Sequence, residues 1–263
     1  MRDLMVCYAL LKQFASMLDA VEVLIRAGAV HASFVPASVA FEVSLYIEWI
    51  LVSDGDNKAN HYYVGTLREE RMWGLRVQGA TSEGSEFLEK MGQLGADILG
   101  QRPALDAEGA AHVKDVERIL ALADYASTNA AFEIYKKTHP RIKHEPEWYK
   151  VLGKRSIAEI AKELQRTAEY IIYYGQGSQV THSISYKDHF KFLRKGVTAQ
   201  PIRNVKDIHT AFNFAFTTAM LVFNRVLGFY RPSELKAFAT QYLNEWRAAF
   251  TNIPTAIIKD ADE

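Results

Sequence analysis

Apolar residues recur at intervals of three and four through most of the chain, which is typical of helices with one buried face. Over 3–29 they fall at Met5, Tyr8, Leu11, Phe14, Leu18, Val21 and Ile25. The pattern predicts a first helix over this range and a second over 36–52, with Pro36 in its first turn. Because the second helix is apolar around most of its circumference, we expect it to be central in the fold.

The same spacing predicts seven further helices. We expect them over 57–77, 83–99, 106–122, 127–137, 156–174, 204–227 and 232–250. Ser156 and Glu159 form a capping-box pattern at the start of the 156–174 helix, and Gly175 and Gly177 are expected to interrupt or end it. Asn204 is expected to cap the next helix. No segment gives a β-hairpin signal, so the sequence predicts an all-α fold of antiparallel helices.

No long polar linker divides the chain, and we expect a single domain over 1–263, with a division near 80–106 as the alternative. The single cysteine, Cys7, excludes an intramolecular disulfide framework and a cysteine-built zinc site. The start of the chain lacks a signal-peptide pattern, and no uncharged apolar run approaches the roughly 18–20 residues of a membrane span. We therefore expect a cytoplasmic protein.

Charge is unevenly distributed, although the 31 basic and 31 acidic side chains balance over the whole chain. The stretch 83–117 carries eight acids against three bases, whereas 185–206 carries six bases against one acid. A local basic patch can bind phosphate in a neutral protein. The candidate phosphate-binding residues are Lys187, Lys191, Arg194, Lys195 and Lys206. The alternative is a solvated surface, or a patch that meets the acidic stretch across a dimer interface.

Several common sites are absent from the sequence. It contains no phosphate-binding loop, no dinucleotide fingerprint and no HExxH motif, and no histidine has a glutamate three residues before it. Glu108 and His112 are four residues apart, a spacing at which both could bind one metal ion on a helix, but two such residues occur at this spacing easily by chance. We therefore expect neither a metal nor a cofactor.

One candidate site includes Tyr174, Ser178 and His182, which share one helix face if the helix continues through the glycines. Ser178 would then orient the His182 imidazole, which would act as a general acid or base. In the alternative interpretation the segment is a structural hinge, in which Ser178 caps a helix and His182 bonds a backbone carbonyl.

A second candidate site includes Arg203, Asn204 and His209. With Asn204 as the cap, the Arg203 guanidinium can reach the helix start, where an anion is favoured, and His209 lies further inside. Arginine and histidine together suit phosphodiester chemistry, because arginine stabilises charge on the phosphate and histidine moves the proton. Alternatively, His209 is a core residue, since Phe212 and Phe216 lie on its face of the helix.

Two carboxylates on the central helix, Glu42 and Glu48, require partners because a lone buried carboxylate is costly. The simple interpretation is an ion pair with an arginine of another helix. The functional interpretation is that these carboxylates help to orient a site histidine.

The run from Trp148 to Ala161, followed by Tyr170, Tyr174, Ser178 and His182, resembles a bacterial family of unknown function related to the HEPN superfamily. The helix over 41–51 is similar to that family's acidic, tryptophan-bearing helix. The resemblance implies a HEPN-like helical bundle with additional helices. Members of that superfamily often form homodimers, and many are toxin or phage-defence ribonucleases, so the resemblance implies a homodimer here as well.

Active members of the superfamily need no metal, and they use an arginine followed four to six residues later by a histidine that assists attack by a ribose 2′-hydroxyl. Arg203, Asn204 and His209 match that spacing, whereas no basic residue stands at that distance before His182. Three functions remain open. They are a metal-independent ribonuclease, a catalytically silent module that binds RNA, nucleotide or a protein such as an antitoxin or defence partner, and a structural or regulatory oligomerisation protein.

Overall fold

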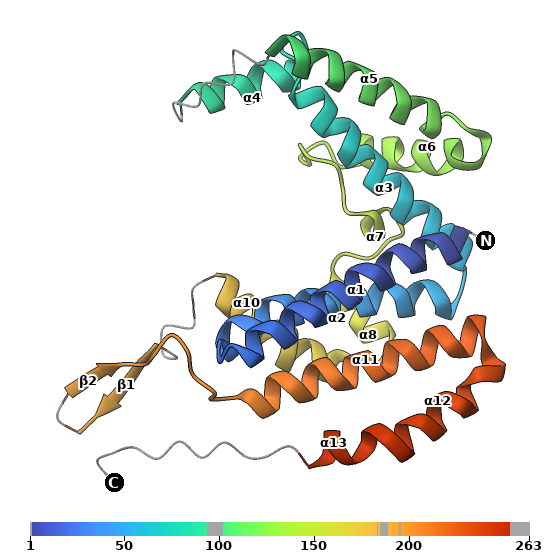
Figure 1. Cartoon of the computed structure of the whole chain (residues 1–263). Helices are drawn as coiled ribbons and strands as arrows, with labels where there is room; N and C mark the ends of the chain where they lie inside the picture. Colours follow the sequence, from blue (N-terminus) through green and yellow to red (C-terminus); the bar gives the residue numbers. More distant parts are fainter. Residues whose placement is uncertain (1, 94–101, 183, 185–188, 195, 253–263) are drawn as a thin grey trace. The chain divides into compact units, whose positions relative to one another are not determined.

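The computed structural model describes residues 2–93, 102–182, 184, 189–194 and 196–252, and it confirms the predicted all-α fold. The strands among these residues form one short hairpin (Figure 1). The chain divides into two compact units, which are 1–6 with 56–156 (unit 1) and 7–55 with 157–263 (unit 2). The boundaries therefore lie near 55 and 156, and all the described residues of the stretch 80–106 belong to unit 1.

Unit 1 is a helical assembly around a buried arginine. Its helices are α3 (Gly55–Arg76), α4 (Ser82–Gln93), α5 (Arg102–Leu120), α6 (Ala123–Thr138) and α7 (Trp148–Val151). Trp148 is buried, as expected for a core aromatic residue. The fully buried Arg68 guanidinium carbon lies 5.3 Å from the centre of the Phe132 ring, so unit 1 has a charged group at the centre of its apolar core.

Unit 2 contains the other helices and the hairpin. Its elements are α1 (Arg2–Arg26, which begins in unit 1), α2 (Val30–Val52), α8 (Ile157–Glu163), α9 (Thr167–Glu169), the π-helix η2 (Tyr170–Tyr174), α10 (Gly175–Thr181), β1 (Phe190–Leu193), β2 (Gly196–Ala199), α11 (Ile208–Tyr230), the 3₁₀ turn η4 (Pro232–Glu234), α12 (Leu235–Gln241), the π-helix η5 (Tyr242–Trp246) and α13 (Arg247–Thr251). Pro232 opens the last helical stretch, as predicted.

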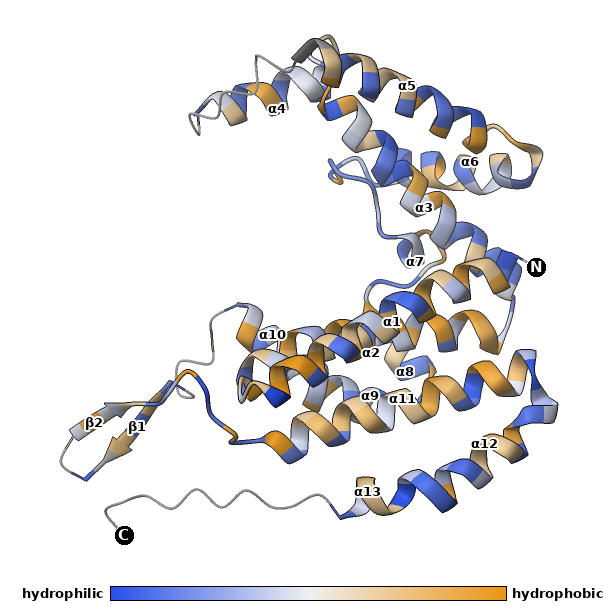
Figure 2. Ribbon diagram, viewed as in Figure 1, coloured by the Kyte–Doolittle hydropathy of each residue, from blue (hydrophilic) through white to orange (hydrophobic). Residues whose placement is uncertain are grey.

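The helix α2 is central in unit 2, as its apolar circumference predicts. Both α10 and α11 pack against it, and the rings of Phe41 and Phe214 lie 5.6 Å apart between α2 and α11. Figure 2 shows apolar residues gathered along α1, α2 and α11. The helix begins at Val30, so the prediction that Pro36 opens it was wrong. Burial of Val30 and Phe34 favours the additional turns, although Pro36 has no N–H to donate to them.

The prediction of one helix over 156–174 that the glycines interrupt or end was wrong at two points. The break comes earlier, at Gln165, whose φ of 60° is left-handed, and the helical backbone then continues through Gly175 and Gly177 to Thr181. A Cβ atom on Gly177 would lie 2.3 Å from Ser38 Cβ and 2.6 Å from the Phe34 carbonyl oxygen. Gly177 therefore allows close packing of α10 on α2, rather than ending the helix.

The hairpin is a feature that the sequence analysis missed. Strands β1 and β2 are antiparallel, with Phe190 opposite Ala199, Phe192 opposite Val197 and Leu193 opposite Gly196. The alternation in Phe-Lys-Phe, the β-branched Val197 and the glycine after a two-residue connection are signals that were present in the sequence. These signals are short and fall within a run of basic residues. The longer helical patterns before and after them are stronger, so the sequence analysis assigned no strands.

Glu48 has the interhelical partners that were expected. Its side chain is 4% exposed, and its carboxylate oxygens lie 3.4 Å from the Arg166 Nη1 atom and 3.4 Å from the Arg225 Nη2 atom. Burial raises the pKa of Glu48, and the two guanidinium groups oppose that rise. Arg166 also donates to Ser44 Oγ at 3.0 Å, so it joins the segment after α8 to α2.

Among the described residues, three helices are long and apolar enough to cross a membrane, judged by length and composition alone: α1, α2 and α11. Within the fold, 61% of the most apolar window of α2 is buried, against 28% for α1 and 17% for α11. Burial in the core accounts for the apolar character of α2. The cytoplasmic location stays a prediction.

Candidate functional site

A cavity of about 230 Å³ lies in unit 2, where the turn between α1 and α2 meets the segments on either side of the hairpin. The backbone holds these segments together. The Asn204 N–H donates to the Gly28 carbonyl oxygen at 2.8 Å, and Ala29 and Asn204 form a parallel bridge. Gly28 has a φ of 72°, which glycine adopts at little cost. This turn therefore holds Ala29 and Asn204, which line the cavity, next to each other.

Two histidines line the cavity, and they come from distant parts of the chain. His31 lies in the first turn of α2, and His189 directly precedes β1. Their ring centres are 5.1 Å apart with the planes at 79°, so one imidazole edge faces the other ring. The His189 carbonyl oxygen accepts the Gln200 N–H at 2.8 Å, which continues the hairpin ladder to the cavity. The hairpin thus positions one of the two imidazoles.

Asn204 and Lys206 line the same cavity, together with Asp207. The Asn204 Oδ1 atom accepts the Lys206 N–H at 2.9 Å, and Asn204 Nδ2 donates to Gln200 Oε1 at 3.3 Å. The prediction that Asn204 caps the following helix was wrong, since α11 begins at Ile208 after Asp207, whose φ is 62°. The Asn204 side chain instead closes a local turn, the usual alternative for asparagine.

The groups in this two-histidine cavity suit phosphate chemistry. Two imidazoles can exchange protons near neutral pH, and an ammonium group attracts a phosphate anion. No group of three or more histidine, cysteine or acidic side chains among the described residues is arranged to hold a metal ion.

Arg203 and His209, predicted to act together, lie in different surroundings. Arg203 is exposed and forms no hydrogen bond or ion pair with another described side chain. His209 lies in the first turn of α11, and its Nε2 atom is buried without a hydrogen-bond partner among the described residues. Neither residue lines the two-histidine cavity.

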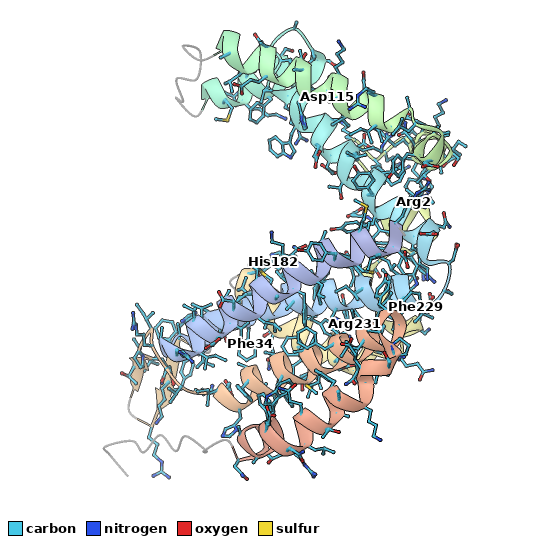
Figure 3. The ribbon with its side chains drawn as sticks, turned by 45° about the vertical axis from the view of Figure 1, so that its right-hand side comes forward. Arg2, Phe34, Asp115, His182, Phe229 and Arg231 are labelled. Atoms are coloured by element: carbon cyan, nitrogen blue, oxygen red, sulfur yellow. The ribbon has the colours of Figure 1, made fainter. Side chains whose placement is uncertain are left out.

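His182, labelled in Figure 3, lies directly after α10 and is exposed. Its backbone N–H donates to the Ser178 carbonyl oxygen at 3.0 Å. No hydrogen bond joins the Ser178 hydroxyl to the imidazole in the described structure. The helical path through the glycines therefore places both residues on α10 without the side-chain contact that the hypothesis requires.

The other candidate phosphate-binding residues divide between the hairpin and the part of the chain that is not described. Lys191 is half-buried on β1 and Arg194 is exposed directly after it. Lys187 and Lys195 lie outside the described residues. Of the three that the structure describes, Lys206 is the one that lines the two-histidine cavity.

Glu42 and Tyr174, predicted as supporting residues, lie near each other. Burial raises the pKa of Glu42, and the Tyr46 hydroxyl donates to its carboxylate at 2.8 Å. Among the described residues, no arginine forms the expected ion pair with Glu42. Burial and the charge of Glu42 raise the pKa of Tyr174, whose ring stacks on Tyr170 at 4.8 Å within η2. Neither residue lines the two-histidine cavity.

The sequence analysis missed His31 and His189 as functional residues. Each is an isolated histidine with no motif around it, and only the long-range packing of α2 against the 189–206 segment pairs them. The available signal was the position of His189 at the edge of the basic stretch. Comparisons with protein-family models, curated proteins and solved structures found no match.

Proposed function

We propose that the protein is a HEPN-like, metal-independent ribonuclease whose reaction takes place in the two-histidine cavity. One observation carries the proposal: His31 and His189 face each other at 5.1 Å in a cavity that Lys206 also lines. The HEPN-like part rests on the resemblance of residues 148–182 to that superfamily and agrees with the all-α fold.

The proposed reaction is cleavage by the neighbouring 2′-hydroxyl of RNA. A neutral imidazole takes the proton of that hydroxyl while its oxygen bonds to phosphorus, and the second imidazole, protonated, gives a proton to the departing 5′-oxygen. The products are a 2′,3′-cyclic phosphate and a 5′-hydroxyl. The Lys206 ammonium stabilises the negative charge that builds on the phosphoryl oxygens. Either histidine can take either part.

Incubation of the purified protein with a single-stranded oligoribonucleotide in EDTA tests the proposal. We expect cleavage with 2′,3′-cyclic phosphate ends, identified by mass spectrometry, and no cleavage of the same oligonucleotide methylated at every 2′-oxygen. Methylation removes the attacking nucleophile but keeps the phosphates, so it is the matched control. Intact unmethylated RNA, or products with 5′-phosphate ends, would contradict the mechanism.

A second candidate function is RNA binding without cleavage. It is favoured by the exposed position of Arg203 and by the fact that Asn204 and Lys206 need neither imidazole to hold a phosphate. In the experiment above, this function gives intact RNA together with binding that weakens steeply as salt is added.

The predicted partners and cellular role belong to the same proposal. A homodimer is supported by the superfamily resemblance and by large apolar residues exposed on α1, such as Met5, Tyr8 and Val23. A role as a toxin or phage-defence effector, an antitoxin or defence partner, and a cytoplasmic location rest on the sequence alone. The structural or regulatory oligomerisation protein is the remaining alternative if the protein neither binds nor cuts RNA.

A further inference from the structure

One face of the hairpin carries an apolar surface with no cover in the described structure. The register places Phe190, Phe192 and Val197 on the same face, because Phe192 pairs with Val197 and alternate residues of a strand share a face. They are 45%, 65% and 58% exposed. Neither phenylalanine ring contacts another aromatic ring among the described residues. We call these three residues the hairpin face.

A short hairpin gains little stability by itself, and exposed aromatic side chains on it are unfavourable in water. The two phenylalanines are two residues apart along one strand, which separates their Cα atoms by about 6.5 Å. Aromatic rings presented in this way on a strand surface are the usual means by which proteins stack unpaired bases.

The charge around the hairpin face favours a polyanion. Among the described residues of 189–206 the charged side chains are Lys191, Arg194, Arg203 and Lys206, and no acidic side chain occurs among them. Lys191 alternates with the two phenylalanines and is therefore assigned to the other face of the hairpin, while Arg194 follows the end of β1. Basic groups beside exposed aromatic residues suit the phosphates and bases of a single strand. A protein partner of ordinary composition would not require this excess of positive charge.

The hairpin face is also next to the two-histidine cavity along the chain. His189 lines the cavity, and Phe190 is the next residue and the first of β1. The Gln200 N–H bond to the His189 carbonyl oxygen extends the ladder at this end of the hairpin. A strand of RNA whose bases stack on the phenylalanines would therefore have a phosphate near the cavity.

We propose that the hairpin face is a stacking platform that makes the protein selective for single-stranded RNA, with Phe190 and Phe192 each packing against an unpaired base. The inference rests on the proposed function, because it names the substrate class of the same site. Base pairing hides the faces of the bases inside a duplex, so a double-stranded RNA cannot use this platform.

Fluorescence anisotropy with a labelled 2′-O-methyl oligoribonucleotide measures binding separately from cleavage. We expect Phe192→Ala and Phe190→Ala each to weaken binding of the single strand by about 5- to 150-fold, the range for loss of one stacked base. Phe192→Tyr keeps the ring and should bind almost as the unaltered protein does. The same oligonucleotide annealed to its complement should bind more weakly, and the alanine substitutions should change that binding little.

Phe229→Ala is the matched control, since Phe229 is 52% exposed on α11, outside the hairpin. It should leave RNA binding unchanged, and circular dichroism should show that all variants are folded.

Unchanged single-strand binding in both alanine variants, Phe190→Ala and Phe192→Ala, would overturn the platform, even if the unaltered protein still cleaves RNA. Loss of self-association in Phe192→Ala without loss of RNA binding would also overturn it and assign the face to a second copy of the chain. If the unaltered protein does not cleave RNA but the alanine variants selectively lose binding of the single strand, the platform is supported and the ribonuclease proposal is contradicted.

Discussion

Replacing His189 with alanine is expected to lower the rate of RNA cleavage by about 10²- to 10⁴-fold, the usual contribution of one general acid or base. His31→Ala should have an effect of the same size, because the proposed reaction needs a proton acceptor and a proton donor. The double variant should be little slower than either single variant, since groups that act as a unit are not additive. The measurement is the single-turnover cleavage rate of one oligoribonucleotide in EDTA.

His182→Ala and His209→Ala separate this site from the two sites suggested by the sequence. His182 is exposed and outside the cavity, and the His209 Nε2 atom is buried, so neither alanine variant should slow the reaction by more than a few-fold. The cavity assignment would be refuted if His182→Ala or His209→Ala abolished cleavage while His189→Ala kept it.

In unit 1, Arg68→Met is expected to lower the free energy of unfolding by about 3–5 kcal/mol, as is usual when one partner of a buried ion pair is removed. The Arg68 Nε atom lies 2.6 Å from Glu145 Oε2, and Nη1 donates to Asn129 Oδ1 at 2.6 Å. The Glu145 side chain is 1% exposed, and the substitution would leave it with Lys136, 2.7 Å away, as its ion-pair partner. Urea unfolding followed by circular dichroism measures the change.

The acid dependence of stability gives a second readout for the same variant. Burial acts to raise the pKa of Glu145, but hydrogen bonds from Arg68 and Lys136 outweigh it and lower the pKa from 4.5. The resulting stabilisation is present above that ordinary value and is lost as the pH falls through the lowered one. Arg68→Met should make this loss smaller.

Arg118→Met is the matched control for Arg68→Met, because Arg118 is 68% exposed and lies 3.8 Å from Asp115. It should change the free energy of unfolding by less than about 0.5 kcal/mol. If Arg68→Met cost as little as Arg118→Met, the buried network would not be a source of stability.

The sequence predicted the fold where the hydrophobic pattern is long and consistent. The central position of α2 follows from its apolar circumference, and the arginine partners of Glu48 follow from the cost of a buried carboxylate. Gly177 was misinterpreted because a glycine that ends a helix and one that admits a neighbouring helix look alike locally. The difference lies in Ser38 and Phe34, which are far away in the sequence.

The site was predicted in part, because charge is visible locally and pairing is not. The basic stretch indicated Lys206, and the Arg203–His209 pattern indicated Asn204; both residues line the cavity. The partner of His189 is His31, and no spacing rule connects two single histidines that lie so far apart in the sequence. Likewise, the spacing of Arg203 and His209 matched a known pattern, but the late start of α11 at Ile208 leaves Arg203 in an exposed loop.

Nuclear magnetic resonance of the histidine rings, during titration with a 2′-O-methyl dinucleoside phosphate, tests most directly whether the cavity is the phosphate site. The phosphodiester binds without being cut, so the result does not depend on turnover. The cavity assignment predicts that the ring signals of His31 and His189 shift together, with one dissociation constant, while those of His182 and His209 stay in place. Shifts at His182 or His209, with His31 and His189 unmoved, would contradict it.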